Sequence, residues 1–184
     1  MDRAILKTVL VALGFLVSLV LAACSEGPDK PDRRQEPDKP PAGVESFGNL
    51  GSKHVKGTVN YAQSPPVGGN HNPTWQNCGY YAEPVPDERA VHSMEHGAVW
   101  IAYSPNLPQE QVERLRDLAQ NQLYVLVSPY PDLGSPIVAS AWGKQLRLDS
   151  ASDPDLERFV RAYSQGTQAP EPGAPCTGGL GSPQ

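Results

Sequence analysis

The segment GAVWIAYS, residues 97–104, is apolar over almost its whole length and contains both β-branched and aromatic residues. Such a run is typical of a strand that is buried on both faces of a sheet. We therefore expect residues 97–104 to form a central strand, and we arrange the other elements around it.

The segments around this strand predict an α+β fold. Apolar residues at helical spacing, with capping residues or proline near the start, predict two helices, at 107–120 and 152–164. Apolar or alternating runs predict further strands, at 54–61, 123–129 and 137–148. Residues 62–90 are rich in proline and glycine and are expected to form a long ordered loop. The order strand, helix, strand, strand, helix favours a small, mostly antiparallel sheet with two helices packed on one face.

The first 24 residues have the layout of a lipoprotein signal peptide. Arg3 and Lys7 precede an apolar run at 9–20, which is followed by Leu21-Ala22-Ala23-Cys24. A membrane-spanning helix needs about 20 apolar residues, and this run is shorter. The Leu-Ala-Ala-Cys block resembles a bacterial lipobox, which implies cleavage before Cys24 and acylation of its thiol. We therefore expect a lipid-anchored protein on the extracytoplasmic face of the cell membrane.

Composition divides the remaining chain into three parts. Residues 24–44 combine many prolines with mixed charge and are expected to form a flexible, lipid-anchored linker. Residues 45–176 have the size of one globular domain, and residues 177–184 are expected to be a disordered tail. The formal net charge of −5 excludes nucleic acid as a partner, because such proteins need a basic surface.

Two cysteines, Cys78 and Cys176, lie in the predicted globular domain. Outside the cytoplasm, two thiols in one small domain form a disulfide more often than a metal site. The chain has no Cys-x-x-Cys motif. We therefore expect a structural disulfide, with a redox or metal-ligand pair as the alternative.

Several short blocks in the domain carry a family resemblance. They are Pro65-Pro66, Gly69-Asn70-His71, Cys78-Gly79-Tyr80, Val85-Pro86, His92-Ser93-Met94-Glu95-His96-Gly97, Ala141-Trp142-Gly143 and Pro170-Glu171. Over about residues 55–176 the sequence resembles a bacterial lipoprotein family, of actinobacterial type, known as domain of unknown function 3105. Many members have Ser-Gly-Pro-His where this chain has Gly-Gly-Asn-His. The resemblance implies a shared domain but no activity.

Three histidines, His71, His92 and His96, lie close together in the sequence. If residues 92–97 form a strand, His92, Met94 and His96 point to one face. Two imidazoles and a thioether suit copper, with His71 brought in by the glycine-rich loop. The sequence thus predicts a transition-metal site, copper before zinc. Its ligands would be these histidines and Met94, with Glu95 supporting them from outside the ligand set.

Two alternatives remain open. If residues 92–97 are helical, His92 and His96 share a face beside Glu95, as in inverted zinc peptidases that use the glutamate as general base. Gly97 and the β-branched run after it argue against that helix, so a metal-dependent hydrolase is less favoured. The histidines would otherwise bond to backbone carbonyls or Glu95, and Met94 would pack in the core. The domain would then be a non-enzymatic module that binds another envelope protein.

Overall fold

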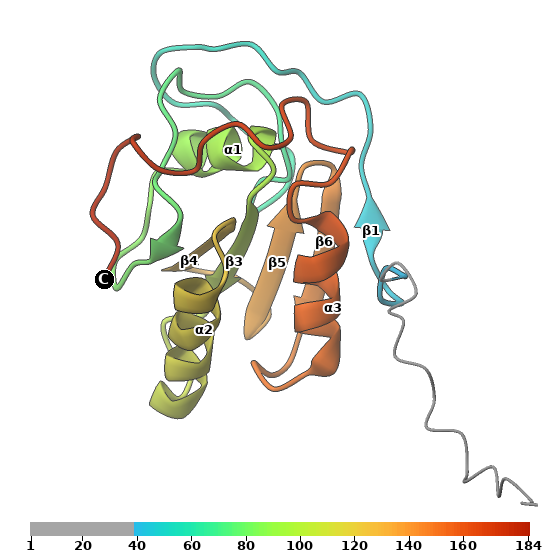
Figure 1. Cartoon of the computed structure of the whole chain (residues 1–184), viewed down its shortest axis with the longest axis vertical. Helices are drawn as coiled ribbons and strands as arrows, with labels where there is room; N and C mark the ends of the chain where they lie inside the picture. The colour runs from blue at the N-terminus through green and yellow to red at the C-terminus, as the bar shows by residue number, and fades with distance from the viewer. Residues whose placement is uncertain (1–38) are drawn as a thin grey trace, which may run out of the picture. The chain divides into compact units, whose positions relative to one another are not determined.

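The strand predicted at 97–104 forms the centre of the sheet. In the computed structural model, which describes residues 39–184, β3 runs from Val99 to Tyr103 and lies between β5 and β4 (Figure 1). All five of its residues are buried. In the register, Ile101 lies opposite Val127 of β4 and Ala139 of β5. The sequence pattern therefore identified the central strand correctly.

The sheet has six strands in the order β1-β6-β5-β3-β4-β2. The other five strands are β1 (Glu45–Ser46), β2 (Gly79–Tyr80), β4 (Val125–Pro129), β5 (Ile137–Ala141) and β6 (Lys144–Leu148). The pairs β3–β5, β5–β6 and β1–β6 are antiparallel, whereas β3–β4 and β2–β4 are parallel. The α+β class is confirmed, but the sheet is mixed. The helix between β3 and β4 acts as a crossover, which returns the chain in the same direction.

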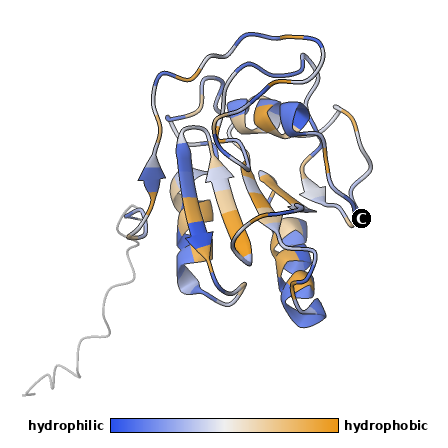
Figure 2. Ribbon diagram, turned by 180° about the vertical axis from the view of Figure 1, so that it is seen from behind, coloured by the Kyte–Doolittle hydropathy of each residue, from blue (hydrophilic) through white to orange (hydrophobic). Residues whose placement is uncertain are grey.

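Two helices, α2 (Gln109–Asn121) and α3 (Pro154–Tyr163), pack on one face of the sheet. Side chains alternate along a strand, so alternate residues of β3 face these helices. Figure 2 shows that the central strands carry mostly hydrophobic residues. The core on this face includes Val99, Ile101, Tyr103, Leu115, Val127, Ile137, Leu156 and Phe159. The predicted pair of helices on one face is confirmed.

A third helix, α1 (Asp87–Glu95), packs against the opposite face through Val91 and Met94, which contact the core around Trp100. The sequence analysis did not favour this helix, because residues 62–90 were expected to be loop and a helix at 92–97 was considered only as the alternative to a strand. Pro86 precedes its first turn, which carries Asp87 and a second acidic residue, a favourable charge at a helix N-terminus.

Gly97 ends this helix immediately after the histidine motif. Its φ of 97° lies in the left-handed region. The Gly97 N–H donates to Met94 O (3.0 Å), and the Ala98 N–H donates to Ser93 O (2.9 Å). This pair of bonds is the Schellman arrangement that closes a helix at a glycine. Gly97 therefore marks the end of α1 rather than excluding a helix before it.

Two other expectations were wrong. Residues 54–61 form no strand beyond a single bridge between His54 and His71. Residues 177–184 are not a free tail, because the Leu180 N–H donates to Trp75 O (3.0 Å) and the Gln184 N–H donates to Tyr80 O (2.9 Å). Main-chain bonds to the loop therefore hold both stretches.

The expected disulfide between Cys78 and Cys176 is present, with 5.4 Å between the Cα atoms. The predicted signal peptide (1–23), Cys24 and most of the predicted linker (24–44) lie outside the described residues. Within residues 39–184, no helix is long and apolar enough to cross a membrane.

We predict that Gly97→Ala lowers the free energy of unfolding by about 1–3 kcal/mol, the cost of a strained backbone conformation. An alanine there would adopt an unfavourable φ, and its Cβ would lie 2.8 Å from Gln165 Cα. Urea unfolding measures the change. The matched control is Gly48→Ala, where a Cβ meets nothing within 4 Å and the expected change is within about 0.5 kcal/mol. Equal stabilities for the two variants would contradict the role assigned to Gly97.

Candidate metal centre

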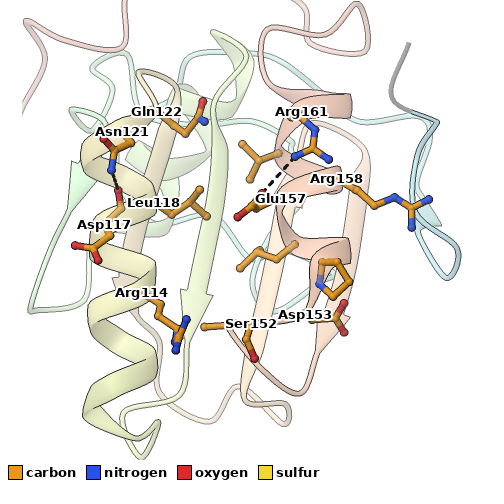
Figure 3. Close-up of a pocket in the computed structure, with 14 residues that line it drawn as sticks. Arg114, Asp117, Leu118, Asn121, Gln122, Ser152, Asp153, Glu157, Arg158 and Arg161 are labelled. Atoms are coloured by element: carbon orange, nitrogen blue, oxygen red, sulfur yellow. Dashed lines mark hydrogen bonds and ion pairs between the residues drawn. The ribbon is translucent and has the colours of Figure 1, made fainter. Parts of the chain in front are cut away.

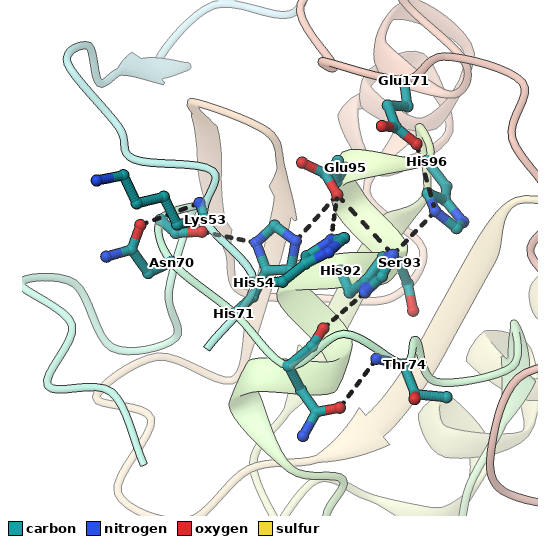
Figure 4. A network of polar contacts seen from close by, with 12 residues as sticks. Lys53, His54, Asn70, His71, Thr74, His92, Ser93, Glu95, His96 and Glu171 are labelled. Atoms are coloured by element: carbon teal, nitrogen blue, oxygen red, sulfur yellow. Dashed lines mark hydrogen bonds and ion pairs between the residues drawn. The ribbon is translucent and has the colours of Figure 1, made fainter. Parts of the chain in front are cut away.

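All four histidines of the chain gather at the end of α1 (Figure 4). His92 lies in the last turn of the helix and His96 caps it. His71 comes from the glycine-rich loop, and His54 is joined to His71 by a bridge between their two segments. In that bridge the Val55 N–H donates to His71 O (2.7 Å). Three separate stretches of chain thus contribute imidazoles to one place.

The carboxylate of Glu95 lies at the centre of this cluster. Its Oε2 atom is 2.9 Å from His71 Nε2, 3.5 Å from His54 Nε2 and 3.8 Å from His92 Nε2. One potential ligand atom from each of these four residues lies within 4.8 Å of those of the others. Glu95, His71 and His92 are buried, whereas the His54 side chain is 50% exposed. The group could hold a metal ion that is reached from the His54 side.

Backbone carbonyls fix the orientation of three of the rings. His71 Nδ1 bonds to Gly69 O (2.7 Å), His92 Nδ1 to Asn72 O (2.6 Å) and His96 Nδ1 to Pro175 O (2.7 Å). A carbonyl oxygen only accepts, so each Nδ1 must carry the proton and donate it. In a neutral ring the opposite nitrogen, Nε2, then presents a lone pair. The three Nε2 atoms all point toward the region around Glu95.

This arrangement brings acceptor atoms together. His92 Nε2 and His96 Nε2 lie 3.0 Å apart, and His71 Nε2 faces a carboxylate oxygen. Two neutral rings that both carry their proton on Nδ1 have no proton to share between their Nε2 atoms. The contacts become favourable only when an added proton or a metal ion supplies positive charge.

Main-chain and side-chain contacts hold the helix and the loop against each other. The Ser93 hydroxyl donates to Gln76 O (2.6 Å), and the Asn72 N–H donates to Glu88 O (3.2 Å). The Trp75 ring packs on His96, with 4.9 Å between the ring centroids. The loop that carries His71 is therefore attached to α1 along its length.

The pKa of His92 is lowered to about 4, mainly by burial and also by the nearby imidazoles of His96 and His71, against the opposing effects of the Asn72 carbonyl and Glu95. A buried imidazole is removed from water, and this loss of hydration disfavours its charged, protonated form. His92 is therefore neutral near pH 7, with its Nε2 lone pair available.

Residues 53–178 match the family described as Protein of unknown function (DUF3105). The match covers more than half of the chain. The chain belongs to this family. The match includes every histidine of the cluster as well as both cysteines of the disulfide. No curated protein and no solved structure gives a significant match, so the DUF3105 match brings no activity with it.

The structure differs from the predicted ligand set at two positions of the DUF3105 domain. Met94 is fully buried in the apolar core beside Trp100, because the segment is helical and Met94 does not share a face with His92. Glu95, expected to lie outside the ligand set, is instead at the centre. The strand interpretation of residues 92–97 is therefore wrong.

Two histidines also differ from expectation. The sequence analysis did not include His54 in the cluster, but its ring stacks on that of His92 with 4.8 Å between the centroids. A backbone bridge to His71 brings it there, and no sequence pattern signals such a contact. His96 is present with its Nε2 3.0 Å from His92 Nε2, but its ligand atom belongs to a second group, formed with Glu95 and Glu171. His71 and His92 lie together as predicted.

A groove lies elsewhere, between α2 and α3 (Figure 3). Its volume is about 680 Å³. Charged residues on its walls pair with neighbours on their own helix, as Arg114 does with Glu110 (3.0 Å) and Arg161 with Glu157 (3.4 Å). The groove contains none of the residues of the histidine cluster.

We predict that the metal-free protein loses stability as the pH falls from about 6.5 to about 4. The pKa of His92 is lowered in the folded state, so the unfolded chain binds more protons in this window and unfolding becomes easier. This residue alone contributes a loss of about 3 kcal/mol by pH 4. Urea unfolding in the presence of a chelator measures it at a series of pH values.

The control for this prediction is His92→Gln, which removes the titrating group. The variant should have a flatter stability profile between pH 4 and pH 6.5 than the wild type. Parallel profiles would mean that His92 does not titrate as its burial requires.

Proposed function

We propose that the DUF3105 domain of this chain binds one divalent transition-metal ion through His54, His71, His92 and Glu95. One observation carries the proposal: three imidazoles and a carboxylate offer ligand atoms that lie within 4.8 Å of one another, and three of these four residues are buried. Two of those rings are oriented by carbonyls that hold their Nδ1 protons. Histidines that bind metals commonly donate their other N–H in this way.

The spacing of the donor atoms supports a small, four-coordinate ion. Ligands bound at about 2.0–2.2 Å to a tetrahedral ion lie about 3.4 Å from one another. The distances from Glu95 Oε2 to the three imidazoles, from 2.9 to 3.8 Å, lie on either side of that value. The spacings among the imidazole ligand atoms are within 4.8 Å, so the side chains would draw together around a bound ion to complete the geometry.

The chemistry of the donors favours Zn²⁺ or Cu²⁺ over Cu⁺. The preference for copper depended on the thioether of Met94, which packs in the apolar core. Three imidazoles and a carboxylate remain, and this nitrogen and oxygen set suits borderline divalent ions.

A role in binding is favoured over hydrolysis. Catalytic zinc sites usually have three protein ligands and leave the fourth position open for water. Here four protein groups fill the tetrahedral set, and Glu95 serves as a ligand rather than as a free general base. The competing hypothesis, a module with structural histidines, accounts for the Nδ1 bonds but not for the convergence of the Nε2 lone pairs.

We further propose that the domain works outside the cytoplasm, as a lipoprotein anchored through Cys24. The lipobox-like Leu-Ala-Ala-Cys block supports this location. The disulfide between Cys78 and Cys176 supports it independently, because structural disulfides persist mainly in oxidising compartments.

We predict that untagged, metal-free protein binds Zn²⁺ tightly near pH 7, and that His54→Ala weakens this binding by at least about 10–100-fold, the range typical of changes to residues that only support a metal ligand. His54 is half exposed, so the variant should fold normally. Calorimetric titration measures the affinity. Affinity should also fall in acid, because protons compete with the metal ion for its ligands.

Lys56→Ala, an exposed change in the same segment, is the matched control and should bind Zn²⁺ like the wild type. Equal affinities for His54→Ala and Lys56→Ala would remove His54 from the ligand set. A wild type that binds neither Zn²⁺ nor Cu²⁺ more tightly than a surface histidine does would leave the structural-histidine hypothesis in its place.

We predict that Cys24→Ala prevents anchoring, because the thiol that accepts the acyl chain is gone. The variant should be released into the medium or remain as an uncleaved precursor. Cell fractionation combined with mass spectrometry distinguishes these forms. Recovery of the variant with membranes at the mature mass would rule out the lipid anchor.

A further inference from the structure

A second group of potential ligands adjoins the first and shares Glu95 with it. It consists of Glu95, His96 and Glu171, with one ligand atom from each lying within 4.8 Å of the others. His96 Nε2 is 3.9 Å from Glu171 Oε2. Figure 4 shows His96 joined by dashed lines to Glu171 and to His92.

We infer that this second group is a metal subsite, so that the domain holds two divalent ions bridged by the carboxylate of Glu95. The inference rests on the proposed function, because the first ion occupies the group formed with His54, His71 and His92. A carboxylate has two oxygens and can bind one ion with each. Ions in such paired sites lie about 3.5–4 Å apart.

The surroundings of His96 support a second ion. Its Nδ1 proton is donated to Pro175 O (2.7 Å), so only Nε2 remains for another partner. The neighbours of that atom are His92 Nε2 at 3.0 Å and the Glu171 carboxylate. Both are acceptors. An ion in the first group would use the His92 lone pair and leave the buried His96 Nε2 facing acceptors alone, a costly arrangement for a buried polar atom.

Main-chain contacts hold Glu171 beside the end of α1. The Glu171 N–H donates to Glu95 O (3.0 Å), and the Gly173 N–H donates to His96 O (3.2 Å). The same segment continues to Pro175, which orients His96, and to Cys176 in the disulfide. The segment thus supplies both a carboxylate and the bond that aims the imidazole.

The two positions should differ in affinity. The first is lined by three imidazoles, whereas the second has one imidazole, the shared carboxylate and a Glu171 side chain that is 60% exposed. The second ion should therefore bind more weakly and exchange more readily with solvent.

The test is to titrate the untagged wild-type chain with Cu²⁺ and to monitor the titration by calorimetry and by electron paramagnetic resonance. We expect two ions per chain. The resonance signal should grow with the first equivalent and weaken with the second, as the two bridged ions couple magnetically. Glu171→Gln should weaken the second step at least tenfold, change the first less than threefold and abolish the coupling.

The matched control is Glu110→Gln, an exposed glutamate on α2 that pairs with Arg114, which should retain both steps. Urea unfolding of the metal-free variants shows whether each one folds. A single ion per chain, unaffected by Glu171→Gln, would overturn the second subsite and leave the proposed function intact. A single ion whose affinity falls in Glu171→Gln would also overturn it, because Glu171 would then belong to the first ion. No bound ion at all would end both proposals.

Discussion

The buried carboxylate of Glu95 constrains the end of α1 and the segments that carry His54 and His71. A charge removed from water is tolerated only when other groups pair with it. Here imidazoles from segments that lie far apart in the chain surround the carboxylate. Because they present lone pairs, an added proton or a metal ion must supply the compensating positive charge. The long loop must therefore fold back over the end of α1 to bring His71 to the carboxylate, and the segment before it must carry His54 alongside. The requirement explains why so much irregular chain is buried, since loops normally run over the surface.

Backbone carbonyls, rather than side chains, determine where the imidazoles point. Gly69, Asn72 and Pro175 each hold one ring by its Nδ1 proton, so a shift of any of these loops would turn an Nε2 atom away from Glu95. The disulfide links the loop after Trp75 to the C-terminal segment, and the Cys78 N–H also donates to Cys176 O (2.8 Å). The covalent bond thus joins two of the loops on which the site depends. For this reason, a loss of order in the C-terminal segment would also disturb the geometry of the histidine cluster.

A sequence pattern predicted an element well when it extended over the whole segment, and failed where the contact joined segments far apart in the chain. The elements at 97–104, 107–120 and 152–164 were predictable because their apolar residues repeat with a strand or helix period over the whole segment. Helix α1 has only nine residues and a glycine follows its cap. Over so short a segment, the residues at 92–97 fitted a strand as well as a helix. That choice of period moved Met94 into the predicted ligand set and Glu95 out of it. His54 depends on a single bridge between distant segments, which no local pattern encodes.

The histidines and Glu95 lie at the C-terminal end of α1, and this location determines the sign of the charge that a bound ion must carry. The last carbonyls of a helix form the negative end of its dipole, which favours a nearby cation by about 0.3–1 kcal/mol. His92, Glu95 and His96 lie in this last turn or at its cap. Among residues 39–184, the charged-group contacts of Glu95 are with histidines, which are neutral unless they gain a proton. The helix end and the carboxylate therefore produce a negative potential at the point where the Nε2 lone pairs also converge. Every protein group there attracts positive charge, so the centre suits a cation and excludes phosphate or another anion as its direct occupant.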